Sequence, residues 1–388
     1  MTALERLMNW TSRIIDFITG KLPLKNQIIF ESKPFFSDNT FCVYKKMVDC
    51  GYNKKYRMYW LSDGSDSNIK LPKNVFIIKR DADSPIEKIK TYWIISRAKF
   101  IIDCNVYVYK KTSRQIRIHL KHGLPLKNAE DYNFRIGELD LLSVPSDYWI
   151  KPCSAEHNID SGYIKALGFP RNDCLVPKPH EQKNIIWMPT WISTASEFQT
   201  DENCRNLVKK IPYGLPCIDD ISQLHEINNL FREHDAILYI RLHPAQDDDL
   251  LPIKNMSNIV LCDNKFLEEN NITLYSFLCT TDALVSDYSS VYYDYLKLDK
   301  PIALIIKFYE EYNSYRKAMP YSYEEYKTRF PASFIVSYEE LKTFFENVFN
   351  EKDPDCEKRK AAKEKYMPDS DSDSSENIIN YMKENYGF

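Results

Sequence analysis

Short runs of apolar, β-branched and aromatic residues alternate with helix-type patterns along most of the chain. In the first half, the predicted strands are residues 27–31, 57–61, 75–79, 100–103, 116–121 and 141–144. In the second half they are residues 185–188, 237–240, 259–261, 283–286 and 302–306, and helices are predicted at 85–98, 218–233, 290–298, 338–349 and over much of 355–385. This alternation is typical of parallel sheets flanked by helices. We therefore expect an α/β protein.

A polar, proline-containing stretch at residues 176–183 separates two halves of this pattern. Halves of about 180 residues are typical of two domains rather than of one large sheet. We expect an N-terminal α/β domain over residues 21–175 and a C-terminal α/β domain with C-terminal helices over residues 176–388, facing each other across a cleft. Polar residues at strand ends would line that cleft, where open α/β sheets bind ligands.

Residues 1–20 have the pattern of an amphipathic helix. Leu7, Trp10 and Ile14 fall on its apolar side, and Arg6 and Asp16 fall on its polar side. The segment is too short and too charged to span a bilayer, so it either packs on the protein or lies at the inner membrane surface. Packing is favoured, because the polar side is not strongly basic.

The composition excludes several function classes. The chain is 44% hydrophobic and 28% charged with a net charge of −3, which indicates a globular protein that does not bind nucleic acid. Its ten cysteines form no C-x-x-C pair and no cleavable signal peptide is recognisable, so we expect a cytoplasmic protein without a metal site. With nine glycines and no G-x-G, the glycine-rich loops of dinucleotide-binding proteins, protein kinases and P-loop enzymes are excluded.

A histidine follows one of the predicted strands directly. His122 comes after the strand 116–121, so its imidazole is expected at the edge of the sheet. An imidazole there can act as the base toward a hydroxyl nucleophile, and a nearby lysine such as Lys127 can attract an anionic substrate. The alternative is a turn histidine that hydrogen-bonds its own loop. His119 lies at an odd spacing from His122, which argues against a shared metal site.

A second candidate lies at the end of the apolar strand 237–240. Arg241 and His243 are two residues apart, so on an extended chain they point the same way and can converge on one phosphate. The alternative is an arginine paired with Asp235 or Asp248 and a histidine that caps a helix.

The third candidate is the run of polar residues after the strand 283–286. Asp287 ends the strand, and Ser289 or Ser290 is expected to cap the following helix. A helix N-terminus offers N–H groups and a positive dipole end to a phosphate, although a serine cap by itself need bind nothing.

In their order and spacing, these segments resemble the CDP-glycerol glycerophosphotransferase family, whose members build teichoic-acid and related polyol-phosphate polymers. Further pieces carry the resemblance over most of the chain: IIFES at 28–32, SDN at 37–39, GFPRND at 168–173, MPTW at 188–191, KPI at 300–302 and residues 336–341. The family's D-G-x-A-S-x-R segment is represented by residues 371–377, without its glycine and arginine.

The resemblance implies a GT-B arrangement of two Rossmann-like domains, with the nucleotide bound mainly by the second and with no cofactor or essential metal. The donor would be a CDP-activated polyol, and the acceptor a hydroxyl of a polyol-phosphate, glycan or lipid-linked chain.

The same resemblance assigns roles to the candidate residues. The first domain would supply the base and the acceptor side, and the second would bind the phosphates and the nucleotide. The residues concerned are His122 as base, Asp38 and Asn39 on the acceptor side, Arg241, His243, Ser289, Ser290 and Lys127 at the phosphates, with His243 also catalytic, and Thr190 and Asp287 at the nucleotide.

Two other functions remain open at this level. One is a GT-B glycosyltransferase that uses a nucleotide sugar for capsule or lipopolysaccharide synthesis, which would break a sugar C–O bond instead of a P–O bond. The other is a non-enzymatic scaffold or carbohydrate-binding subunit of a cell-envelope complex. The sequence does not indicate the oligomeric state.

Overall fold

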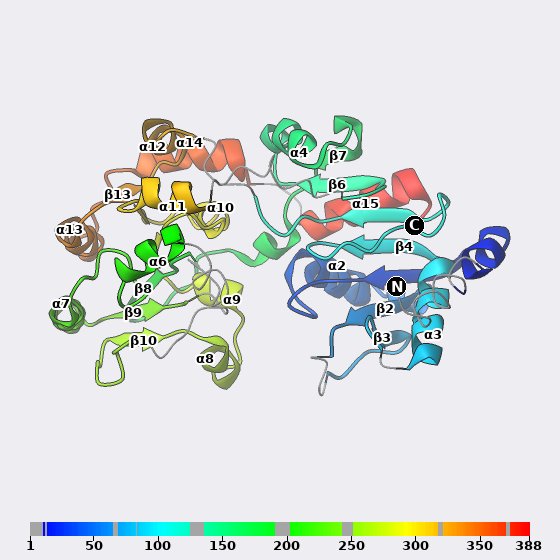
Figure 1. Ribbon diagram of the computed structural model, residues 1–388, viewed down its shortest axis with the longest axis horizontal. Helices are drawn as coiled ribbons and strands as arrows, with labels where there is room; N and C mark the ends of the chain where they lie inside the picture. The colour runs from blue at the N-terminus through cyan, green and yellow to red at the C-terminus, as the bar shows by residue number, and fades with distance from the viewer. Residues whose placement is uncertain are drawn as a thin grey trace. The chain divides into compact units, whose positions relative to one another are not determined.

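The computed structural model describes residues 11, 14–64, 69–82, 84–124, 136–190, 202–242, 251–316, 321–369 and 373–388. These residues form two compact units, each with its own parallel sheet and its own helices (Figure 1). The first unit contains the described residues up to 123 together with 136–173 and 373–388, and the second contains residues from 174 to 369.

The first unit is built on a seven-stranded sheet with the order β3-β2-β1-β4-β5-β6-β7. All neighbouring strands pair in parallel. The strands are β1 (Lys25–Phe30), β2 (Arg57–Ser62), β3 (Val75–Lys79), β4 (Ala98–Asp103), β5 (Ile116–His119), β6 (Leu141–Val144) and β7 (Ile164–Ala166). The order reverses between β1 and β4, so the loops after β1, β4 and β5 leave the sheet side by side, at the position where open α/β sheets bind ligands.

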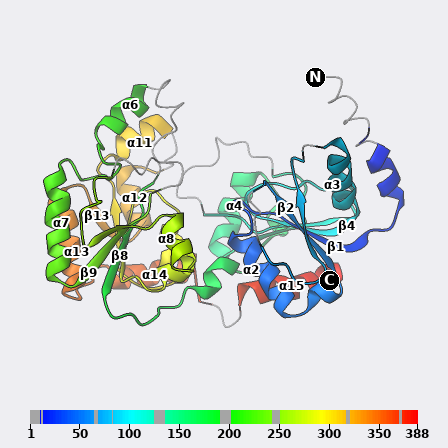
Figure 2. The same cartoon turned by 90° about the horizontal axis from the view of Figure 1, so that it is seen from below.

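Helices cover both faces of this sheet (Figure 2). Ile28 and Phe30 of β1 point to one face, where α2 and α15 pack, and Ile29 points to the other, where α3 packs. Burial on both faces explains why the strands are continuous apolar runs. The helices of this unit are α2 (Asp38–Asp49), α3 (Pro85–Arg97), α4 (Ile150–His157) and α15 (Ser374–Tyr386), with short 3₁₀ turns η1 (Tyr52–Lys54), η2 (Asp147–Trp149), η3 (Ser161–Tyr163) and η4 (Pro170–Cys174).

The second unit has a six-stranded parallel sheet with the order β10-β9-β8-β11-β12-β13. Here the order reverses between β8 and β11. The strands are β8 (Lys183–Trp187), β9 (Ala236–Ile240), β10 (Ile259–Leu261), β11 (Ala283–Ser286), β12 (Ile302–Ile305) and β13 (Ser333–Ile335). The helices are α6 (Glu202–Lys209), α7 (Ile221–Glu233), α8 (Asn264–Glu269), α9 (Leu274–Leu278), α10 (Val291–Leu296), α11 (Tyr309–Arg316), α12 (Tyr323–Arg329), α13 (Tyr338–Phe349) and α14 (Cys356–Tyr366).

The end of the chain belongs to the first unit. The sequence pattern assigned residues 176–388 to one C-terminal domain, whereas α15 returns to pack against α2. Ile378, Ile379 and Met382 of α15 and the terminal Phe388 are buried in the core of the first unit. The physical reason is that the apolar side of α15 completes a face of the first sheet, a contact between distant parts of the chain that no local pattern encodes.

The described part of the segment 1–20 is helical from residue 14 and packs on the first unit. Ile15 and Thr19 are buried, and the hydroxyl of Tyr92 on α3 donates to the Asp16 carboxylate at 2.7 Å. Phe17 and Ile18 are exposed, at 66% and 41% of their surface. Residues 1–10, 12 and 13 lie outside the described residues, so the amphipathic helix is seen only in part. Within the described ranges, no helix has the length and apolarity needed to cross a membrane.

Candidate active site

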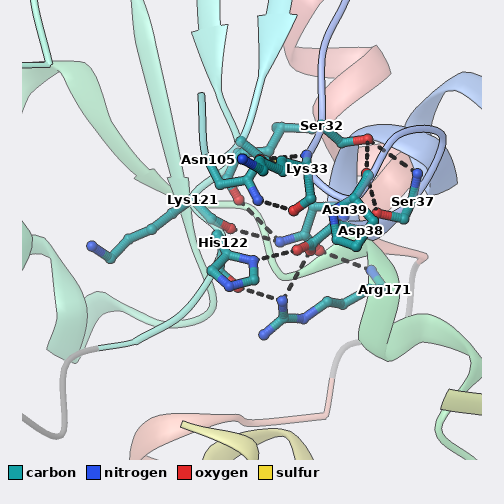
Figure 3. Close-up of polar contacts among 12 residues, drawn as sticks. Ser32, Lys33, Ser37, Asp38, Asn39, Asn105, Lys121, His122 and Arg171 are labelled. Atoms are coloured by element: carbon teal, nitrogen blue, oxygen red, sulfur yellow. Dashed lines mark hydrogen bonds and ion pairs between the residues drawn. The ribbon is translucent and has the colours of Figure 1, made fainter. Parts of the chain in front are cut away.

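His122 and Asp38 form a hydrogen-bonded pair at the carboxyl edge of the first sheet (Figure 3). Nδ1 of His122 lies 2.5 Å from Oδ2 of Asp38. His122 follows β5, and Asp38 is the first residue of α2, which follows β1. The side chain of His122 is 58% exposed and that of Asp38 is 7% exposed. The pair therefore presents the imidazole to solvent and keeps the carboxylate inside the protein.

Arg171 holds the other side of the same carboxylate. Its guanidinium donates to Oδ1 of Asp38 at 2.9 Å, and the same nitrogen, Nη1, donates to the backbone carbonyl of His122. The side chain of Arg171 is 6% exposed. It belongs to η4, in the G-x-P-R-x-D segment, which the sequence indicated as a family motif without assigning it a role in a site.

Asn39 ties the three loops of this site together. Its side-chain amide donates to the carbonyls of Leu120 and Lys121 at 3.0 and 2.8 Å, and its side-chain oxygen accepts from the backbone N–H of Arg171 at 2.9 Å. Asn39 is fully buried. Both ends of the Asn39 amide are thus used inside the protein, where they hold the loops of the site in place; its predicted place on the acceptor side remains a prediction.

The loop before Asp38 is fixed by polar contacts of its own. The hydroxyl of Ser32 accepts from the backbone N–H of Ser37 at 3.0 Å, and the backbone N–H of Lys33 donates to Oδ1 of Asn105 at 2.7 Å. Asp38 has a positive φ of 63°, a left-handed conformation that is uncommon for non-glycine residues and is tolerated best by Asn and Asp. These contacts set the position from which the Asp38 carboxylate meets His122 (Figure 3).

The charges of the site favour an ionised Asp38. Burial by itself raises the pKa of Asp38, but the positive charge of Arg171 and the hydrogen bond from His122 outweigh it and lower that pKa to about 2. An ionised carboxylate accepts a hydrogen bond, so Nδ1 of His122 carries the proton and donates it. The lone pair of the exposed imidazole is then on Nε2, where it can take a proton from a substrate hydroxyl.

A layer of buried charge lies beneath this site at the ends of β4 and β5. Asp103 accepts from Nε of Arg117 at 2.9 Å and lies 2.6 Å from Nδ1 of His119, and all three side chains are buried. Lys121 donates to Glu156 of α4 at 2.6 Å. In Figure 3 the Lys121 side chain extends away from His122.

A buried carboxyl, that of Glu31, directly follows β1. Burial raises the pKa of Glu31 to about 7, although Arg80, whose guanidinium lies 2.6 Å away, opposes the shift. The Glu31 side chain is 1% exposed, and its carboxylate accepts from the backbone N–H of Val106, in the loop after β4, at 3.2 Å.

In the second unit, the structure brings Thr190 and Asp287 into direct contact. They follow β8 and β11, the two strands between which the strand order reverses. The backbone N–H of Thr190 lies 2.8 Å from Oδ2 of Asp287, and the Thr190 hydroxyl donates to Oδ1. Asp287 is buried, so it fixes the strand end that carries Thr190.

Thr190 and Asp287 also line a small cavity of about 20 Å³, room for about one water molecule. Other lining residues are Tyr288, Lys307, Phe308 and Tyr312. The rings of Tyr288 and Tyr312 stack with their centroids 4.5 Å apart. The cavity therefore has mostly apolar and aromatic walls, and Thr190 and Asp287 at its edge come from two neighbouring strand ends.

Arg241 is engaged at the end of β9. Its guanidinium donates to the carbonyl of Cys262 at 2.7 Å and to the side-chain oxygen of Asn264 at 2.8 Å. Both of these partners are neutral. Of the two carboxylates that the sequence offered as partners of Arg241, the structure describes Asp235, and Arg241 does not form an ion pair with it. His243, Asp248 and Lys127 lie outside the described residues.

The two serines before α10 differ from the expected cap. Ser290 occupies the position before the helix, but its side chain makes no capping hydrogen bond in the described structure. The hydroxyl of Ser289 accepts from the N–H of Val291 at 3.5 Å, at the limit of a hydrogen bond. The expected serine cap is therefore weak. Both residues are partly exposed and their hydroxyls lie at the start of α10, whose own residues are all buried.

No group of three or more potential metal ligands occurs among the residues that the structure describes.

Solved structures identify the fold class. A structure of the wall teichoic acid polymerase TagF has a TM-score of 0.72 to this chain at 22% identity, covering 98% of this chain and 94% of that one. A UDP-N-acetylglucosamine 2-epimerase has a TM-score of 0.53 at 12% identity, covering 94% and 96%. At these identities the likeness shows the fold alone. The protein has the GT-B-like fold of two Rossmann-like units that the sequence predicted.

The sequence comparison then identifies the family. The profile of the CDP-glycerol:poly(glycerophosphate) glycerophosphotransferase family matches residues 16–384, and the chain belongs to this family. The resemblance seen in the motifs is thereby confirmed.

Curated relatives are teichoic acid enzymes. The teichoic acid poly(glycerol phosphate) polymerase of Staphylococcus epidermidis is 24% identical over 307 residues, covering 71% of this chain and 39% of that protein. The Bacillus subtilis polymerase of the same name is 22% identical, covering 87% and 46%. The chain thus spans less than half the length of these two relatives. The B. subtilis teichoic acid glycerol-phosphate primase is 21% identical, with 90% of each chain covered.

Proposed function

We propose that this protein transfers a polyol phosphate, glycerol phosphate or ribitol phosphate, from a CDP-activated donor to an acceptor hydroxyl and releases CMP. Membership of the glycerophosphotransferase family supports the reaction class. The observation that carries the mechanism is the His122–Asp38 pair, which offers an exposed imidazole oriented by a buried carboxylate.

In the proposed reaction, Nε2 of His122 takes the proton of the acceptor hydroxyl. The acceptor oxygen attacks the phosphorus that carries the polyol, a phosphodiester bond forms, and the P–O bond to CMP breaks. Transfer of this kind depends mainly on positioning and on neutralising charge. Asp38 holds the imidazole in the required tautomer and stabilises the imidazolium that forms, as the carboxylate of a catalytic triad does.

The second unit is proposed to bind the donor. Thr190 and Asp287 shape the strand ends at its reversal point, where open α/β sheets bind nucleotides. The guanidinium of Arg241 and the hydroxyls of Ser289 and Ser290 are proposed to contact the diphosphate. His243, proposed as a catalytic and phosphate-binding group, and Lys127, proposed at the phosphates, retain those roles on the sequence pattern alone.

Nucleotide release tests this function. The wild-type protein and His122→Ala are incubated with CDP-glycerol, CDP-ribitol or UDP-N-acetylglucosamine and a polyol-phosphate acceptor, and the free nucleotide is measured. We expect CMP from a CDP-polyol with the wild type, and a rate lower by about 10²–10⁴-fold with His122→Ala while donor binding is kept. Release from the nucleotide sugar instead would establish a glycosyltransferase. Wild-type turnover by His122→Ala would disprove the base.

The acceptor and the place of the reaction are also proposals. A lipid-linked acceptor would bring the protein to the inner face of the cell membrane, and the exposed Phe17 and Ile18 support such an attachment. Co-sedimentation with vesicles of anionic lipid, compared between the full chain and a variant lacking residues 1–20, tests it. Equal sedimentation of both would rule out this segment as the attachment.

A further inference from the structure

Arg171 contacts both members of the His122–Asp38 pair. Its Nη1 donates to the Asp38 carboxylate at 2.9 Å and to the backbone carbonyl of His122, so one guanidinium fixes the carboxylate and the backbone of the histidine together (Figure 3). The side chains of Arg171 and Asp38 are 6% and 7% exposed. The exposed imidazole of His122 can therefore contact a substrate, whereas the buried side chain of Arg171 lies on the protein side of the pair.

Arg171 is itself held in place through its backbone. Its N–H donates to Asn39, and the Asn39 amide donates to the carbonyls of Leu120 and Lys121. The guanidinium carbon also lies 5.5 Å from the centre of the Phe169 ring. The arginine is thus fixed relative to the loops that carry both Asp38 and His122, as required of a group that sets the orientation of others.

The charge of Arg171 also bears on the protonation of His122. An ionised carboxylate by itself favours the imidazolium, which cannot act as a base. Arg171 offsets this negative charge, so the carboxylate that orients the imidazole is itself balanced by a cation. Arg171 of η4 contacts both members of the pair, while Lys121 is directed to Glu156 and His157 of α4.

We infer that Arg171 is a positioning residue of the transfer reaction, which holds the Asp38 carboxylate and the backbone of His122 in alignment so that the imidazole can take the acceptor proton. This inference rests on the proposed function, in which His122 is the base. It goes further, because it assigns to the G-x-P-R-x-D segment a role in the chemistry.

The test compares Arg171→Met, which removes the charge, with Arg171→Lys, which keeps it and changes the geometry. Arg97→Met is the matched control, because Arg97 is also a buried arginine of the first unit, 8% exposed, and donates to the carbonyl of Pro23 far from His122 in the sequence. CMP release from CDP-glycerol is measured from pH 5.5 to 9, with donor binding measured by calorimetry and folding by circular dichroism.

We expect Arg171→Met to lower kcat about 100-fold and to leave KM for the donor within about twofold, because the residue touches the base and not the donor. The acid limb of its pH profile should move to higher pH, since the unbalanced carboxylate favours the imidazolium. Arg171→Lys should recover part of the rate and keep the wild-type acid limb. Adding His122→Ala to Arg171→Met should lower the rate no further than His122→Ala alone, as expected of residues that act as a unit.

The inference is overturned if both Arg171 variants keep the wild-type kcat and pH profile while His122→Ala is inactive, a result that leaves the proposed function intact. It is also overturned if Arg171→Met and Arg97→Met lose rate equally. If Arg171→Met does not fold, Arg171→Lys decides: an unchanged kcat refutes the positioning role, and a reduced kcat with the wild-type acid limb supports it. If His122→Ala itself turns over normally, the proposed base fails first, and this inference fails with it.

Discussion

A Cβ atom built on Gly168 would lie 2.2 Å from Oγ and 2.6 Å from Cβ of Ser374. Gly168 opens the G-x-P-R-x-D segment and has a φ of +94°, and Ser374 is the first residue of α15. At the other end of the segment, Asp173 accepts from the backbone N–H groups of Ser374 and Ser375 at 3.0 and 3.1 Å. The absence of a side chain at Gly168 thus allows the N-terminus of the last helix to dock beside the segment that carries Arg171.

Gly168→Ala should destabilise the protein by about 2–4 kcal/mol, because it adds an overlap with Ser374 to a backbone conformation that disfavours alanine. Unfolding in urea measures the change. Gly64→Ala is the control, because Gly64 also has a positive φ, +105°, but no atom within 4 Å of its added Cβ. We expect a loss of about 1 kcal/mol there. Equal losses in free energy of unfolding for the two variants would show that α15 moves away from residue 168 without an energetic cost.

Asp38→Asn should lower kcat by about 10²–10⁴-fold with little change in donor affinity, because an amide can donate to Nδ1 of His122 and then holds the wrong tautomer. The measurement is CMP release at saturating CDP-glycerol. Asp49→Asn, on the exposed last turn of the same helix, should retain the wild-type rate. An active Asp38→Asn would show that His122 does not depend on this carboxylate.

Glu31 should make the protein less stable as the pH rises. Its pKa is about 7 in the folded protein against 4.5 for an ordinary glutamate, so the folded state binds the proton more tightly between these values. The stability it contributes is fully present below pH 4.5 and is lost as the pH rises through 7. In urea unfolding, the free energy of unfolding of Glu31→Gln should therefore rise relative to that of the wild type by about 2–3 kcal/mol between pH 5 and pH 8.

Glu87→Gln, at an exposed glutamate in the first turn of α3, is the control for this pH dependence. Its stability should follow that of the wild type at both pH values. The prediction is wrong if the difference in free energy of unfolding between Glu31→Gln and the wild type is the same at pH 5 and pH 8.

Asp287→Asn should weaken donor binding by about 10-fold or more, because it replaces one of the two carboxylate oxygens that accept from the Thr190 N–H with an NH₂ group, which can only donate, and it removes the negative charge. Calorimetry with CDP-glycerol measures the effect. Asp235→Asn, just before β9 at the opposite edge of the same sheet, should bind as the wild type does. Unchanged binding by Asp287→Asn would separate this strand end from the donor site.

The alternating pattern predicted most of the strands, because fully buried parallel strands must be apolar over several residues whatever surrounds them. It missed β7 and β13, each of three residues, which are too short to show a period. It also missed α2, whose first turn carries Asp38 and Asn39. The amphipathic pattern of α2 is interrupted by polar residues that are buried because they hold the site together.

The sequence by itself determined the α/β class, the two Rossmann-like units, the family and the place of His122 after a strand. Each follows from local pattern or from residues close together in the chain. Only the tertiary structure decided that Asp38 orients His122, that Asn39 is internal, that Arg171 lies behind the pair and that α15 belongs to the first unit. These relationships join segments far apart in sequence, and they are set by the packing of the sheet and by the burial of charge, which have no period along the chain.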